Sequence, residues 1–243
     1  MSDSNPPKPK LRWYQFNLRT LLLFVMVAGV VFGLLGQRIQ RIRNEIRATD
    51  KLAKLGGAIL LHQQNELKDV LSIPDRWLWK CFTYRPVCDI CFIGNQATDA
   101  VVENLKGLTS LQVLNLGKTQ VTDAGLEHIK GLTSLQTLYL ADTQITDVGL
   151  EHLKDLTCLQ DLILDGTQVT DAGLEHIKGL TSLQELDLDG TQVTDAGLEY
   201  IKGLPSLHSL YLDDTQITDV GVKKLQKALP KCWIDRANLS TDF

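Results

Sequence analysis

The sequence contains none of the motifs that mark a reaction centre. It has no glycine-rich phosphate-binding loop, no cluster of residues with the spacing of metal ligands, and no serine or cysteine with a plausible base. His128, His152 and His176 recur at a fixed interval, but side chains on an outward-curving surface spread apart instead of converging on a metal ion. The sequence therefore points to a non-catalytic protein and gives no reason to expect a cofactor or a bound metal ion.

Cysteines are few, and their odd number favours free thiols over a disulfide framework. The chain has five. Cys88 and Cys91 form a C-x-x-C pattern, but three residues along a strand span about 10 Å, whereas a disulfide needs alpha carbons within about 7 Å. Cys81 could pair with one of the two if the domain is exported. The cysteines therefore do not decide the cellular compartment.

Charged residues are absent between Arg19 and Arg38, a stretch of 18 residues that is almost wholly apolar. A helix of that length reaches about 27 Å, close to the thickness of the hydrocarbon core. The two arginines can extend to the membrane interfaces, and Trp13, Tyr14 and Phe16 suit the aromatic belt on one side. This predicts a single-pass membrane protein with its transmembrane helix over 20–37.

A cleaved signal peptide is the alternative explanation of this stretch. No A-x-A-like cleavage site follows it, and it runs into a basic segment in place of a small polar one. Basic residues flank the stretch on both sides and are slightly more numerous after it, so the positive-inside rule leans weakly towards a cytoplasmic C-terminal domain. The net charge of −4 conceals an asymmetry, because this front part is basic and the remainder is acidic. An acidic second half argues against nucleic-acid binding.

The second half of the chain contains five copies of one sequence motif, which begins at Leu108 and recurs every 24 residues. The motif is L-T-S-L-Q-x-L-x-L-x-x-T-Q-V-T-D-A-G-L-E-H-I-K-G. A fixed period of this size predicts a stacked solenoid, in which each unit buries its apolar side against its neighbours. Leu114 and Leu116 alternate as in a short strand, and Leu126 and Ile129 are spaced for one side of a helix of about two turns.

Two threonines of each copy have a predicted structural role. Thr122, followed by Asp123, has N-cap chemistry at the start of the short helix. Thr119 is expected to point inward and to bond backbone groups of the adjacent turns, because a buried hydroxyl needs a partner.

This pattern resembles the leucine-rich repeat family, L-x-x-L-x-L-x-x-N/C-x-L, with threonine where the family usually has Asn or Cys. The T-D-A-G-L that follows is similar to repeats of F-box substrate receptors and of membrane-anchored bacterial proteins, and N-L-R-T-L-L-L at 17–23 resembles the start of the latter. The resemblance implies an α/β solenoid with a curved parallel sheet on its concave side, short helices outside, and protein–protein recognition. The expected parts are a basic tail over 1–19, the transmembrane helix over 20–37, a basic helix over 38–56, an N-terminal cap over 57–86, repeats over 87–228 and a C-terminal cap over 229–243.

The strand positions that flank the core leucines are expected to point into the concave face, and there the copies differ most. Eight acids and one lysine occupy these positions. Like charges on neighbouring strands are unfavourable, so their accumulation predicts a partner protein with a basic surface, with tyrosines as aromatic anchors. The alternative is a solvated acidic face that only maintains solubility. The candidate partner-binding residues are Tyr139, Asp142, Asp161, Asp165, Glu185, Asp187, Asp189, Tyr211, Asp213 and Asp214.

The sequence thus predicts a membrane-anchored, non-catalytic module that binds a protein partner. One alternative is a substrate-receptor-like subunit of a protein-degradation complex, which F-box-type repeats suggest but an anchor within residues 1–60 disfavours. The other is a surface that binds a cation or a small ligand, although a flat sheet rarely provides the six to eight or so oxygens that calcium requires.

Overall fold

The computed structural model describes residues 89–92 and 97–236, together with single helical positions between 33 and 47. The solenoid predicted from the repeats lies almost entirely within these ranges. The predicted N-terminal cap over 57–86 and most of the predicted transmembrane segment over 20–37 lie outside them. Within the described residues, no helix combines the length and the apolar character needed to cross a membrane.

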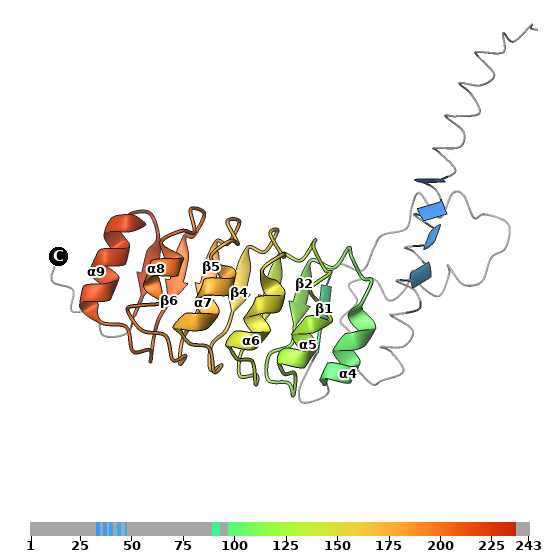
Figure 1. Ribbon diagram of the computed structural model, residues 1–243, viewed down its shortest axis with the longest axis horizontal. Helices are drawn as coiled ribbons and strands as arrows, with labels where there is room; N and C mark the ends of the chain where they lie inside the picture. Colours follow the sequence, from blue (N-terminus) through green and yellow to red (C-terminus); the bar gives the residue numbers. More distant parts are fainter. Residues whose placement is uncertain are drawn as a thin grey trace, which may run out of the picture. The chain divides into compact units, whose positions relative to one another are not determined.

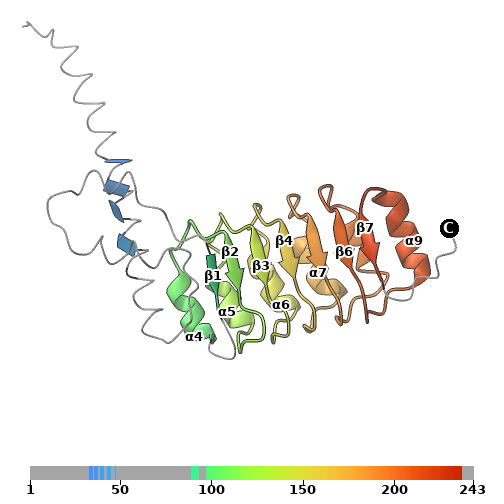
Figure 2. The ribbon, with the colours of Figure 1, turned by 180° about the vertical axis from the view of Figure 1, so that it is seen from behind.

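The strands form one parallel sheet in which every strand lies beside the next one in the sequence. The order is β1-β2-β3-β4-β5-β6-β7, and each strand is three residues long. Figure 2 shows the strands as a row of parallel arrows. The strands are Asp89–Cys91 (β1), Val113–Asn115 (β2), Thr137–Tyr139 (β3), Asp161–Ile163 (β4), Glu185–Asp187 (β5), Ser209–Tyr211 (β6) and Trp233–Asp235 (β7).

Short helices return the chain from each strand to the next and cover the other side of the sheet (Figure 1). Only α7 and α9 reach the predicted length of about two turns; the other helices are shorter, although α4 and α6 continue directly as 3-10 turns. Their bounds are Asp99–Val102 (α4), Asp123–Glu127 (α5), Asp147–Leu150 (α6), Asp171–Ile177 (α7), Leu198–Ile201 (α8) and Asp219–Ala228 (α9), with 3-10 turns at Glu103–Leu105 (η1) and Glu151–Leu153 (η2).

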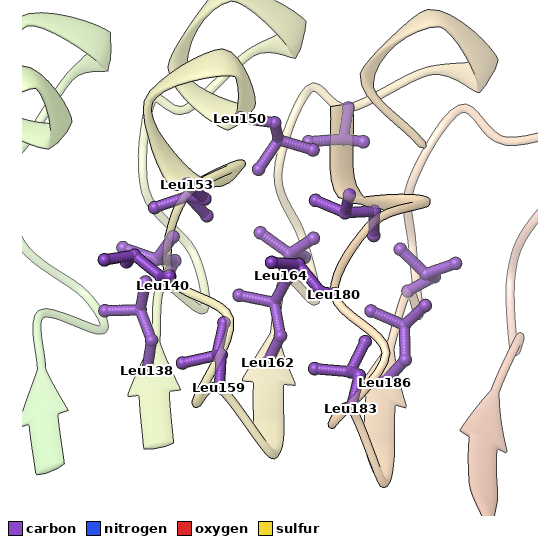
Figure 3. Packing of buried hydrophobic residues seen from close by; sticks show 14 of the residues in the cluster. Leu138, Leu140, Leu150, Leu153, Leu159, Leu162, Leu164, Leu180, Leu183 and Leu186 are labelled. Atoms are coloured by element: carbon purple, nitrogen blue, oxygen red, sulfur yellow. The ribbon is translucent and has the colours of Figure 1, made fainter. Parts of the chain in front are cut away.

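A single apolar core runs between the sheet and the helices. Leu138 and Leu140 from β3 and the residue after it meet Leu150 and Leu153 from the helical side, and all four are buried completely. Figure 3 shows the same arrangement repeated in the next units along the solenoid. A unit this small has no interior of its own, so the leucines are buried only because neighbouring units stack against it.

The repeated threonine after each strand is buried, as the sequence predicted, but its partner is different. Thr119 Oγ1 donates a hydrogen bond to the carbonyl oxygen of Leu116, at 2.6 Å, within the same repeat. The prediction that the column bonds adjacent turns was therefore wrong. The hydroxyl closes the tight turn that follows its own strand, and Thr143, Thr167 and Thr191 make the same bond.

The connection between adjacent repeats comes from the Thr-Asp pair. Asp123 Oδ1 accepts a hydrogen bond from the backbone N–H of Thr146, at 2.8 Å, and Asp123 Oδ2 accepts one from Thr146 Oγ1, at 2.6 Å. Thr146 Oγ1 in turn accepts a bond from the backbone N–H of Val148, which caps α6. We call this contact the Asp-Thr staple. Staples also join Asp99 to Thr122, Asp147 to Thr170, Asp171 to Thr194 and Asp195 to Thr218.

Candidate protein-binding face

The side of the sheet opposite the helices is built from two strand columns and a turn column. In register along β1 to β7, the first column contains Asp89, Val113, Thr137, Asp161, Glu185, Ser209 and Trp233, and the second contains Cys91, Asn115, Tyr139, Ile163, Asp187, Tyr211 and Asp235. The turn column continues each strand with Gly117, Ala141, Asp165, Asp189 and Asp213. We call these three columns, together with the residue that follows each member of the turn column (Lys118, Asp142, Gly166, Gly190 and Asp214), the open sheet face. Of the ten candidate residues, Tyr139, Asp161, Glu185, Asp187 and Tyr211 lie in the strand columns, and the other five lie in the turns that follow; their role in binding a partner stays a prediction.

Carboxylates occupy the middle of this face on neighbouring strands. Asp161 is the register partner of Glu185, and strands of one sheet lie about 4.8 Å apart. Asp161 also accepts a hydrogen bond from Thr137 Oγ1 at 2.8 Å, which holds it against β3. In the turn column, Asp189 Oδ1 accepts a bond from the backbone N–H of Asp213 at 2.6 Å, and Asp187 Oδ1 accepts one from the N–H of Asp189 at 3.0 Å.

The electrostatic cost of this arrangement shows in the pKa values of three aspartates. The pKa of Asp189 is raised to about 6, mainly by burial; the hydrogen bond from the N–H of Asp213 lowers it, and the nearby carboxylates of Asp187, Asp213 and Asp165 raise it. Burial also raises the pKa of Asp165, with Asp142 adding to it, and burial raises the pKa of Asp187. Asp165 Oδ1 is enclosed and has no hydrogen-bond partner in the structure. The middle of the face thus holds negative charge that the fold itself does not neutralise fully.

Lys118 partly compensates the negative charge of Asp142, the first carboxylate of the acidic region. Its Nζ lies 3.9 Å from Asp142 Oδ2, and both side chains are more than half exposed, so the pair contributes little. Lys118 and Asp142 both adopt a left-handed backbone, with φ of 58° and 52°. Gly166 and Gly190 take the same turn position in the next two repeats, where φ is 65° and 64°, and glycine adopts this conformation without strain.

The two candidate tyrosines are not neighbours. Tyr139 on β3 lies between Asn115 and Ile163 in register, and its side chain is exposed. Tyr211 on β6 lies between Asp187 and Asp235, and its ring contacts Trp233 edge to face, with centroids 5.4 Å apart and an interplanar angle of 82°. The single predicted set of anchors therefore divides into an isolated tyrosine and an aromatic pair beside carboxylates.

Three residues of the face were missing from the sequence-based set. Asp89, Trp233 and Asp235 lie on the first and last strands, in the same columns as the other members. Trp233 is 55% exposed and is one of the largest apolar surfaces of the described solenoid. The alternation around the buried Ile90 and Ile234 was the available signal, and it was masked because the two terminal units diverge from the repeat.

The histidine column and the cysteines do not form a second site in the described part of the chain. No group of three or more metal-ligating side chains comes together there. The described cysteines are Cys91, Cys158 and Cys232, all with free thiols, of which Cys232 is buried. Cys81 and Cys88 lie outside the described residues, so a disulfide between those two stays a prediction.

Comparison with known families matches two stretches of the solenoid. Residues 109–169 match the model described as "Leucine rich repeat", and residues 181–224 match the model "Leucine Rich repeats (2 copies)". The register of the sheet agrees with these matches. Residues 109–169 and 181–224 of the solenoid are leucine-rich repeats. Leucine-rich repeat domains generally mediate protein–protein interaction and are typically non-catalytic.

Among solved structures, two internalins of Listeria monocytogenes are similar. An internalin matches with 26% identity and a TM-score of 0.50, over 64% of this chain. This chain spans only 40% of that internalin. Internalin C2 matches with 28% identity and a TM-score of 0.47, over 63% of this chain and 75% of its own length. The search of curated proteins gave no match.

Proposed function

We propose that this chain is a membrane-anchored leucine-rich repeat protein that binds a protein partner with a basic surface through its open sheet face. The face is the broad side of the sheet that the helices leave free (Figure 2). Five of the ten candidate residues lie on its strands and the other five in the turns that follow them. Its central carboxylates lie on adjacent strands, and a cationic partner would remove repulsion that the fold bears alone.

The observation that carries the proposal is the contrast between the two sides of the solenoid. On the helical side, glutamates are paired with lysines three residues later, as in Glu127 with Lys130 and Glu175 with Lys178. On the open sheet face, Asp165, Asp187 and Asp189 instead crowd together and have raised pKa values. A surface that served only solubility would gain from the pairing seen on the helical side, so the unpaired carboxylates favour recognition of a cation.

The membrane anchor in this proposal depends on the sequence alone, through the uncharged stretch at 20–37. Extraction of cell membranes with alkaline carbonate tests it, because an anchored protein stays in the pellet. Release of the full chain into the supernatant would remove the anchor from the proposal. Labelling of intact cells at a cysteine introduced at Lys231, in a background without the five natural cysteines, then determines on which side of the membrane the repeats lie.

Binding can be tested with the full chain and a fluorescein-labelled peptide of alternating lysine and glycine. The triple variant Asp165→Asn, Asp187→Asn, Asp189→Asn removes three charges from the open sheet face. Its matched control, Glu127→Gln, Glu151→Gln, Glu175→Gln, removes three from the helical side. We expect the first variant to bind roughly tenfold more weakly in fluorescence anisotropy, at about 0.3 to 1 kcal/mol per charge, and the control to stay within about twofold. Equal affinities of both variants would contradict the proposal.

A further inference from the structure

The C-terminal end of the open sheet face differs from the rest because an aromatic pair lies directly beside carboxylates. Tyr211 and Trp233 come from adjacent strands, β6 and β7, and contact each other edge to face at 5.4 Å between centroids. Tyr211 is half-buried, whereas Trp233 lies on the last strand of the described sheet and keeps 55% of its surface exposed. Tyrosine and tryptophan are enriched at protein–protein interfaces, so the pair is a candidate contact on this face.

Carboxylates flank the pair within the same sheet. Asp187 and Asp235 are the register partners of Tyr211 on its two sides, and Glu185 occupies the first column on β5. Their proximity is visible in the phenol of Tyr211, whose pKa is raised first by burial and then by the charges of Glu185, Asp187 and Asp235. We call Tyr211, Trp233, Glu185, Asp187 and Asp235 the aromatic corner.

A ring face beside carboxylates fits one kind of side chain particularly well. A guanidinium group is planar, so it can stack on an aromatic ring while its edge N–H groups donate to carboxylates. A lysine ammonium ion is compact and strongly hydrated, and it gains less from the ring. The corner offers both features at once, whereas Tyr139 on β3 has Asn115 and Ile163 as its register partners.

The cation nearest in sequence to the corner is already paired. Arg236 directly follows β7, but its guanidinium group donates to Asp219 at the start of α9. Among the described residues, no ion pair involves Glu185, Asp187 or Asp235. The carboxylates of the corner are therefore available to a cation from a partner.

We infer that the aromatic corner is the subsite that receives an arginine side chain of the partner protein. This inference rests on the proposed function and makes it more specific: the acidic centre of the face attracts the basic partner, and the corner selects arginine over lysine. The arginine lies against the indole of Trp233 and donates hydrogen bonds to the neighbouring carboxylates.

Three fluorescein-labelled peptides of equal length test the inference against the full chain: alternating arginine and glycine, alternating lysine and glycine, and alternating citrulline and glycine. Citrulline keeps the shape of arginine without its charge. We expect the arginine peptide to bind several-fold more tightly than the lysine peptide, and the citrulline peptide to bind hardly at all. Trp233→Ser should weaken arginine binding about three- to tenfold and abolish the preference over lysine, and Trp233→Phe should restore part of it.

The matched control is Tyr139→Ser, which removes an exposed aromatic residue from the same face without touching the corner. It should leave the preference for arginine unchanged, and circular dichroism should show that both serine variants stay folded. If Trp233→Ser binds both charged peptides as the unmodified protein does, while the triple Asp→Asn variant has lost them, the corner is wrong and the proposed function stands. If the triple variant also retains full affinity, both fail. If the chain binds a second copy of itself more tightly than it binds any of the three peptides, the assignment of the corner to a partner protein is likewise wrong.

Discussion

Replacing Gly173 with alanine should destabilise this protein, although the same change in an ordinary helix does the opposite. Gly173 is the third residue of α7, and alanine in a helix interior is favoured over glycine by about 1 kcal/mol. Here, however, a Cβ atom at this position would lie 2.5 Å from Asp147 Oδ1. Atoms do not approach so closely, so the carboxylate of Asp147 would have to leave its place.

The size of the effect follows from what that carboxylate does. Asp147 accepts hydrogen bonds from the backbone N–H of Thr170 at 2.8 Å and from Thr170 Oγ1 at 2.7 Å, which is the staple between two repeats. A hydrogen bond to a charged group contributes about 1.5 to 3 kcal/mol; since the staple is only partly buried, we take about 2 to 3 kcal/mol for the two together. Subtracting the helical gain of alanine leaves a net loss of about 1 to 2 kcal/mol.

A double-mutant cycle separates this mechanism from general crowding. Urea unfolding of the full chain, followed by circular dichroism, gives the free energies of Gly173→Ala, Asp147→Ala and the double variant. With the carboxylate removed, a Cβ at 173 would still lie 3.0 Å from Leu150 Cδ1 and 3.1 Å from Val169 Cγ1, so part of the crowding remains. Alanine at 173 should therefore cost clearly less stability in the Asp147→Ala background than in the unmodified protein. Gly179→Ala serves as a control, because a Cβ there meets no atom within 4 Å. A stabilising Gly173→Ala, or additive losses in the cycle, would refute the staple as the reason for glycine.

Three further changes have definite expected outcomes. Asp189→Asn should raise the urea midpoint at pH 7 but not at pH 4. A carboxylate whose pKa is about 6 in the folded protein binds more protons in the folded than in the unfolded state between about pH 4 and 6, so the charge of Asp189 lowers stability as pH rises through that window. A change in midpoint that is the same at both pH values would show the reasoning wrong. Thr167→Val should cost about 1 kcal/mol in the same unfolding assay, because it removes the buried 2.6 Å bond to the carbonyl oxygen of Leu164; an unchanged midpoint would count against that bond. Arg236→Ala should speed amide hydrogen exchange in α9 and leave exchange in α7 unaffected, because it removes the partner of Asp219 at the start of the last helix. The same change in exchange rate in both helices, or no change in α9, would contradict this.

The period of the repeat was enough to predict the parallel order of the strands and the identity of the buried leucines. Burial of Leu114, Leu138, Leu162, Leu186 and Leu210 follows from alternation within a strand, which needs no knowledge of the neighbours. The same alternation predicts which strand residues lie on the side opposite the helices, because a residue between two buried ones has to point away from the core.

Contacts between repeats could not be predicted in the same way. The sequence identified Thr-Asp as cap chemistry, and the threonine does cap the helix in several repeats. The aspartate instead reaches the next repeat, 23 residues away, and a local pattern contains no information on so distant a partner. The prediction for Thr119 was wrong in the opposite direction. We expected its hydroxyl to bond an adjacent repeat, but it donates to the carbonyl oxygen of Leu116, three residues earlier.

The divided behaviour of the aspartates is the strongest argument that the open sheet face has been shaped for a partner. Asp123 and its counterparts from Asp99 to Asp195 are each bonded to the next unit, and each therefore stabilises the solenoid. Asp187 occurs where the other full copies have asparagine, tyrosine or isoleucine, and Asp189 belongs to a run of three aspartates with Asp165 and Asp213 in the turn column. Both lie beside further carboxylates and have pKa values raised mainly by burial. Asparagine would keep the acceptor oxygen of Asp189 and remove the repulsion, so packing alone gives no reason for the charge. A charge that weakens the fold at neutral pH is explained most simply if it contributes to an interaction that the isolated chain does not make.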